Sequence, residues 1–180
     1  MNHGAPARQR VSACNAMYRV TAGEAGQAAI LWYRTEARVF AGDVAGAIAD
    51  ADAAVKLLPG NADMLNAKCW SRAVADRELE VARAACDRSL EMDRSAAALD
   101  SRGLLGLRQG RWREAWADYD AAVTANPSLA GSLYGRGLAA LAMGRTAEGE
   151  ADIRQAAGAA AEFRYYGLTP EAVKAKAGTG

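Results

Sequence analysis

The chain reads LDSRGLLGLRQGRWREAWADYDAAVTANP from Leu99 to Pro127, and the same order of residue types recurs on both sides of this stretch. A leucine opens each copy, and a basic residue and then a turn residue follow at fixed distances. These positions are Leu31, Leu65, Leu99 and Leu133; Arg34, Lys68, Arg102 and Arg136; and Gly42, Asp76, Gly110 and Gly144. Every step is 34 residues, and a fixed period of this length predicts a stack of repeated structural units.

Each copy carries the signals of two helices separated by a tight turn. The chain has only 4 prolines, and its apolar content of 51% is largely alanine, which favours closely packed helices. In the copy at residues 28–61, we expect Gly42 to end the first helix and Asp43 to cap the second. Apolar residues then recur at helical spacing at Ala47, Ile48, Ala51, Ala54 and Val55. The sequence therefore predicts an all-α chain of consecutive helix pairs.

The repeat phase also suggests where each segment begins and ends. We predict a disordered N-terminus at 1–10, a lone helix capping the array at 11–27, four repeats at 28–61, 62–95, 96–129 and 130–161, a C-terminal capping helix at 162–176 and a loose tail at 177–180.

The second helix of the repeat at 62–95 is displaced from the common phase. A strict step from the stripe at Ala47 places Arg88 among the apolar positions. A step of 35 residues instead selects Ala82, Cys86, Ser89 and Leu90, which restores a small and apolar set. We therefore predict one extra residue in the turn Ala75–Glu78 and one fewer in the next connection, Met92–Ala96.

Composition and motifs exclude several classes of protein. A net charge of +1 provides no basic field for nucleic acid, and no apolar run is long enough to span a membrane. No signal peptide is visible, so the expected location is the cytoplasm, with the periplasm as the alternative if a native leader is missing. His3 is the single histidine, so we expect no histidine-based triad and no metal site. Gly135-x-Gly137-x-x-Ala140 imitates a dinucleotide fingerprint but lies inside an expected helix, without the preceding strand, so no cofactor is expected.

Two sets of residues allow both a structural and a chemical interpretation. Asp50, Asp118 and Asp152 recur in phase on second helices, and we predict a solvated helix face in preference to a catalytic pair. Cys69 and Cys86 lie on the two helices of one repeat, at similar heights from its turn. They are either small buried thiols, which is the commoner outcome, or a disulfide if the protein meets an oxidising compartment.

The repeated pattern resembles the tetratricopeptide repeat, a family with two antiparallel helices in each 34-residue unit. The family's small residues at helix crossings match Gly103 and Gly137 on first helices and Ala47, Ala82, Ala115, Ala54, Ala122 and Ala156 on second helices, and its closing proline matches Pro59 and Pro127. Thr35 and Cys69 depart from the pattern as larger residues. The opening Ala13-Cys14 helix and the closing Tyr166-Gly167-Leu168-Thr169-Pro170 are similar to those of short bacterial repeat proteins. The resemblance covers 28–161 and implies a right-handed solenoid of antiparallel helix pairs.

In that family the first helices line a concave face that holds peptides or partner helices. Eight residues at its inward positions are expected to bind a partner: Trp32, Glu36, Asn66, Trp70, Asp100, Leu104, Tyr134 and Leu138. Aromatic side chains are favoured interface anchors, and packing against the next helix is the alternative. The set predicts an apolar or amphipathic partner segment with some basic character, and it lacks the basic residues of the family's carboxylate clamp.

The resemblance and the groove residues together predict a non-catalytic protein-interaction module that binds a partner peptide or helix. One alternative is a structural solenoid that associates with itself through an exposed end or its convex face. The other is an enzyme subunit with a carboxylate site formed by Glu36, Asp63 or Asp100. These carboxylates lie on successive repeats and do not converge, so we expect no catalytic residues.

Overall fold

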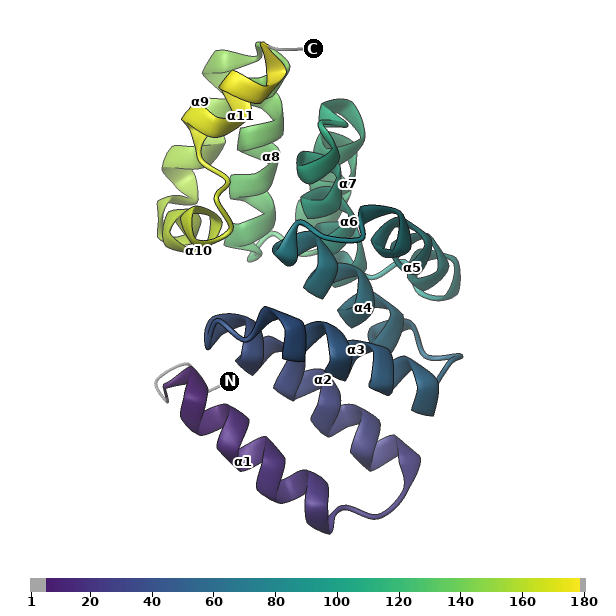
Figure 1. Cartoon of the computed structure of the whole chain (residues 1–180). Helices are drawn as coiled ribbons and strands as arrows, with labels where there is room; N and C mark the ends of the chain where they lie inside the picture. The colour runs from purple at the N-terminus through teal and green to yellow at the C-terminus, as the bar shows by residue number, and fades with distance from the viewer. Residues whose placement is uncertain (1–5, 179–180) are drawn as a thin grey trace. The chain divides into compact units, whose positions relative to one another are not determined.

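In the computed structural model, which describes residues 6–178, every regular element is a helix (Figure 1). The chain divides into two compact units, residues 1–92 and 93–180. The N-terminal unit contains α1 (Ala7–Val20), α2 (Glu24–Phe40), α3 (Val44–Leu57), α4 (Ala62–Ala75) and α5 (Leu79–Met92). The C-terminal unit contains α6 (Ala96–Gln109), α7 (Trp112–Ala125), α8 (Ala130–Ala142), α9 (Thr146–Gln155), a short 3-10 turn (Ala157–Ala159), α10 (Ala160–Tyr165) and α11 (Pro170–Ala177). Helices pack in consecutive pairs, α2 on α3, α4 on α5, α6 on α7 and α8 on α9, which confirms the predicted all-α class.

The four predicted turn residues all adopt the left-handed backbone conformation. The φ angle is 82° at Gly42, 53° at Asp76, 71° at Gly110 and 76° at Gly144. The backbone N–H after each of them donates to the carbonyl five residues earlier, as at Arg111, whose N–H lies 2.9 Å from the carbonyl oxygen of Gly106. This bond closes the last turn of the helix, and it is the usual reason for glycine at this place.

The displaced phase of the second repeat is confirmed. Helix α5 begins at Leu79, 35 residues after the start of α3 at Val44, whereas α7 and α9 begin at multiples of 34 from Val44. The extra turn residue is accommodated by a positive φ of 48° at Glu78. The residues selected by the longer step, Ala82, Cys86, Ser89 and Leu90, are all buried, and Arg88 is exposed.

In three repeats, the recurring arginine forks onto an aspartate 16 residues later on the second helix. Two guanidinium nitrogens lie 2.6–2.8 Å from the two carboxylate oxygens in the pairs Arg34–Asp50, Arg102–Asp118 and Arg136–Asp152. The aspartates are only 4–6% exposed, so the predicted solvated face is wrong. A bidentate arginine compensates each buried carboxylate, because burial without such a partner would be costly.

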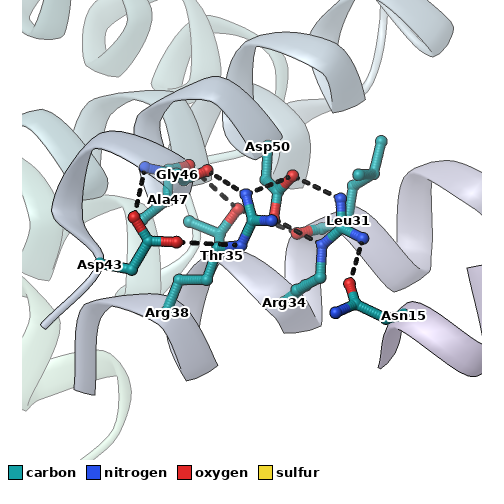
Figure 2. Close-up of polar contacts among 9 residues, drawn as sticks. All are labelled: Asn15, Leu31, Arg34, Thr35, Arg38, Asp43, Gly46, Ala47 and Asp50. Atoms are coloured by element: carbon teal, nitrogen blue, oxygen red, sulfur yellow. Dashed lines mark hydrogen bonds and ion pairs between the residues drawn. The ribbon is translucent and has the colours of Figure 1, made fainter. Parts of the chain in front are cut away.

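The same basic residue also reaches back toward the preceding second helix. These contacts are Lys68–Asp52 at 3.1 Å, Arg136–Asp120 at 2.8 Å and Arg34 over the ring of Tyr18 at 5.3 Å. Figure 2 shows Arg34 between its two neighbours, with Asp50 of α3 on one side and Asn15 of α1 on the other, where Nη1 of Arg34 donates to Oδ1 of Asn15 at 2.8 Å. One basic residue in each of these repeats therefore ties its own helix pair to the helix before it.

Helix α1 begins earlier than predicted and leaves an apolar face open. Residues 7–10 are helical, so the disorder predicted for them is wrong, and residues 1–5 lie outside the described part of the chain. Ala13, Met17 and Val20 stand 34 residues before Ala47, Ala51 and Ala54, which are completely buried in α3. On α1 all three are exposed, Val20 by 84%. These residues are exposed because α1 corresponds to the second helix of a repeat whose first helix is missing. The face that such a first helix would cover is therefore open and apolar, whereas a typical capping helix has a polar outer face.

The C-terminal segment forms two short helices in place of the single predicted one. Gly167 has a φ of 71°, and Thr169 caps α11 by accepting from the N–H of Ala172 at 3.2 Å. Both α10 and α11 pack on α8. The segment also reaches the end of α6, where Nη2 of Arg108 donates to the carbonyl of Tyr166 at 2.6 Å and Nζ of Lys176 donates to the carbonyl of Arg108. Among the described residues, no helix is both long and apolar enough to cross a membrane.

Candidate functional site

Four of the eight predicted groove residues lie on the first helices of the N-terminal unit. Trp32 and Glu36 belong to α2, Asn66 and Trp70 belong to α4, and these two helices contact each other. All four side chains are partly exposed. Trp32 and Asn66 occupy equivalent positions of adjacent repeats, as do Glu36 and Trp70. The N-terminal unit therefore presents two tryptophans, a carboxylate and an amide on neighbouring first helices.

The polar members of this set differ in how well they are satisfied. Glu36 forms an ion pair of 3.4 Å with Arg10 of α1, and the Arg10 guanidinium also lies 5.9 Å from the ring centre of Phe40. Asn66 is different, because its Oδ1 is buried and has no hydrogen-bond partner among the described residues. A buried acceptor without a partner is costly, so the Asn66 Oδ1 is an unsatisfied polar atom beneath this face.

Trp32 shows how such an aromatic residue is held. Its ring centre lies 4.6 Å from that of Tyr33, with the planes at 63°. One side of Trp32 packs against a buried cluster formed by Ala28, Leu31, Ala54 and Met64. The tryptophan is thus fixed by the core and still partly open to solvent, which is the arrangement of an interface anchor.

The equivalent positions of the C-terminal unit are mostly closed. Leu104, Tyr134 and Leu138 are buried, whereas Asp100 is partly exposed. The ring of Phe163 in α10 lies 5.0 Å from that of Tyr134. Leu104, Tyr134 and Leu138 therefore do not line an open surface in this structure, and Tyr134 is covered by Phe163 of the C-terminal segment that packs on α8.

Asp100 sits in a polar cluster beside this segment. Its Oδ1 accepts a hydrogen bond of 2.6 Å from Ser132. Burial raises the pKa of Asp100 to about 6, the Ser132 bond opposes this rise, and the charge of Glu162 adds to it. Glu162 in turn accepts from the Tyr166 hydroxyl at 2.5 Å.

Tyr119 of α7 joins this cluster through a gap between two glycines. A Cβ atom at Gly135 of α8 would lie 2.3 Å from Cζ of Tyr119, and one at Gly103 of α6 would lie 2.9 Å from the same ring. The Tyr119 side chain is completely buried, and its hydroxyl has no hydrogen-bond partner among the described residues. Burial, then the charge of Asp100, raises its pKa well above the usual value. The sequence analysis did not identify Tyr119. Two signals were available: Tyr119 is a large residue in phase with the small Ala51, and the following first helix carries a glycine at position 135.

The carboxylates considered for an enzyme have separate surroundings. Glu36 pairs with Arg10, Asp63 is exposed in the first turn of α4, and Asp100 bonds to Ser132. Within residues 6–178, no group of three histidine, cysteine or acidic side chains is placed to hold a metal ion.

The cysteines of the second repeat lie face to face. The structure joins Cys69 of α4 and Cys86 of α5 as a disulfide with Cα atoms 5.2 Å apart, and both side chains are completely buried. Cys14 of α1 is a half-buried free thiol, and desolvation by burial raises its pKa.

Comparisons with known proteins identify the fold. No protein-family model matches the sequence, and no curated protein matches it. The structure is similar to that of a tetratricopeptide repeat protein from Parabacteroides merdae, with a TM-score of 0.64, 18% identity and 83% of this chain covered. The chain spans 57% of the length of that protein. It is also similar to two structures of MamA. The first has a TM-score of 0.60 and 18% identity, with 98% of both chains covered. The second has a TM-score of 0.61 and 17% identity, with 91% of this chain and 93% of the MamA chain covered. The chain therefore has the tetratricopeptide repeat fold.

Proposed function

We propose that this chain is a non-catalytic protein-interaction module that binds a partner peptide or helix on the first-helix face of its N-terminal unit. The observation that carries the proposal is the set Trp32, Asn66 and Trp70 on α2 and α4, which is partly exposed, whereas three of the four equivalent residues of the C-terminal unit, Leu104, Tyr134 and Leu138, are buried. Tryptophans supply large apolar anchors for such a segment.

The charge on this face indicates what the partner carries. Glu36 is the carboxylate beside Trp32, and in the free chain it is neutralised by Arg10 of α1. The 3.4 Å pair is partly solvated, so exchanging it for a basic side chain of the partner costs little. We therefore propose an apolar or amphipathic segment with at least one lysine or arginine.

The proposal is tested by capturing partners from extracts of the native cell on the immobilised full chain. Trp70→Ala and Asn66→Ala alter the proposed face, and Tyr165→Ala is the matched control because Tyr165 is an exposed aromatic residue of α10. We expect proteins that are retained by the native chain and by the control to be lost with Trp70→Ala. Equal retention by all four chains would refute the assignment of the face.

Self-association is the second candidate, because Ala13, Met17 and Val20 leave an apolar stripe open on α1. Static light scattering over a range of concentrations separates it from partner binding. Under this alternative, the mass rises above 18.9 kDa with concentration. The rise disappears in Val20→Lys and persists in Val81→Lys, a matched change at an exposed residue of α5.

A further inference from the structure

The C-terminal unit has two adjoining hollows at the start of α7. The larger, of about 440 Å³, is lined by Gly110, Arg111, Trp112, Arg113, Glu114 and Met143. The smaller, of about 340 Å³, is lined by Arg113, Trp116, Met143 and Arg145. Because Arg113 and Met143 line both, the hollows are neighbouring parts of one surface depression, and each has the size of a small ligand pocket.

The charge of this surface is positive and only partly compensated. Arg111 lies 3.6 Å from Glu114, and Arg145 lies 2.5 Å from Glu148. Arg113 is exposed, and no carboxylate of the described residues forms an ion pair with it. The guanidinium of Arg113 is therefore available to form a bidentate hydrogen bond with the carboxylate of a ligand.

The aromatic residues make the walls of the depression firm. The Arg145 guanidinium lies 4.4 Å from the ring centre of Trp116, and Nε1 of Trp116 donates to Oε1 of Glu148 at 3.0 Å. This triple contact fixes the tryptophan, and Trp112 and Met143 add apolar surface. Tryptophan, arginine and methionine are the residue types enriched where proteins bind other proteins.

The repeat itself does not require these residues. The positions in phase with Trp112 are Val44 and Thr146, and those in phase with Arg113 are Ala45 and Ala147. In the displaced second repeat the two places are Leu79 and Glu80. The other helix pairs therefore form without a tryptophan or an arginine at these places.

We propose that this depression binds an acidic, extended segment of a partner protein, in which a carboxylate pairs with Arg113 and a neighbouring apolar side chain packs on Trp112 and Met143. The site lies on one unit and does not depend on the function proposed for the first-helix face. Trp112, Trp116 and Met143 give the depression apolar surface for a side chain of the segment, which favours a protein over a nucleic acid.

The test uses the full chain and a fluorescein-labelled peptide, Gly-Asp-Phe-Asp-Leu-Gly, followed by fluorescence anisotropy. We expect saturable binding to the native chain. We expect the affinity for Arg113→Glu to be lower by roughly tenfold or more. Arg94→Glu is the matched control, because Arg94 is exposed outside the depression, and it should bind as the native chain does. Trp112→Ala should also weaken binding, which tests the apolar contact separately from the charge.

Three results would overturn the proposal. The first is no detectable binding of this peptide to the native chain at millimolar concentration. The second is equal binding of the analogue with both Asp residues replaced by Asn, because the carboxylate would then play no part. The third is tighter binding of a labelled oligothymidine that is lost in Arg113→Glu, which would identify the surface as a nucleic-acid site.

Discussion

The recurring arginine–aspartate pair is the residue-scale feature on which the helix pairs depend most. Asp118→Ala leaves the largely buried Arg102 without its bidentate partner, and we expect the free energy of unfolding to fall by about 2–4 kcal/mol. Glu91→Ala removes a solvated partner of Arg88 and should cost less than about 0.5 kcal/mol. Urea denaturation of the two variants measures the difference. Equal losses would mean that the buried pair does not hold α6 to α7.

Tyr119 tests whether a buried hydroxyl is truly without a partner. Tyr119→Phe removes only the unpaired oxygen, so we expect stability to stay the same or to rise by up to about 1 kcal/mol. Tyr119→Ala removes the ring between Gly103 and Gly135 and should cost about 3–5 kcal/mol. Thermal unfolding followed by circular dichroism compares them. A clear loss in Tyr119→Phe would show that the hydroxyl donates to a group, such as an ordered water.

Asp100 gives stability a dependence on pH with a definite sign. Its pKa rises from the ordinary 3.8 to about 6 on folding, chiefly through burial, so the folded state holds the proton more tightly. Between these two values Asp100 lowers stability as pH increases, because ionisation becomes possible first in the unfolded chain. The free energy of unfolding of Asp100→Asn minus that of the native chain should therefore be larger at pH 7.5 than at pH 4. We expect the increase to be about 1–2 kcal/mol, after allowance for the partial exposure of Asp100.

Urea denaturation at the two pH values measures this gain, and Asp93→Asn serves as the control because Asp93 is exposed. The interpretation of Asp100 fails if the two variants respond to pH alike.

At the scale of the helices, Cys69 and Cys86 offer a covalent link between α4 and α5. Their separation of 17 residues predicts that closing this loop stabilises the chain by about 3 kcal/mol. Protein purified from its native cells should have an intact mass two hydrogen atoms below the reduced mass, and reductant should lower its unfolding free energy. Cys14→Ser should leave both results unchanged. Fully reduced cysteines in native protein would instead indicate a reducing compartment.

Helix boundaries were predictable wherever the backbone required a special residue. Gly42, Asp76, Gly110 and Gly144 mark the turns because each must adopt positive φ. The displaced stripe at Ala82 and Cys86 was also visible, because a charged residue cannot replace a small one between packed helices. These features depend on residues close together in the sequence, so they can be predicted from its periodicity.

Contacts between elements were less predictable. Asp118 looked like a solvated residue because the sequence does not reveal that Arg102 crosses to it. Tyr134 packs against Phe163, which lies on α10 after the last repeat, in a segment that the repeat pattern does not describe. The hollows beside Arg113 lie between the start of α7 and Met143, which follows α8. No sequence motif indicates that these two places are in contact.

At the scale of the whole molecule, the two units differ in what they leave open. The N-terminal unit exposes part of Trp32 and Trp70 on its first helices, whereas α10 and α11 pack on α8 in the C-terminal unit. The proposed function therefore predicts an asymmetric molecule, in which partner binding depends on the first half of the repeats.

Amide hydrogen exchange of the full chain, with and without a captured partner, measures where the partner binds. We expect the partner to slow exchange in α2 and α4, and we expect Trp70→Ala to abolish this protection while Tyr165→Ala preserves it. Protection confined to α5, α7 or α9, with α2 and α4 unchanged, would contradict the proposed function.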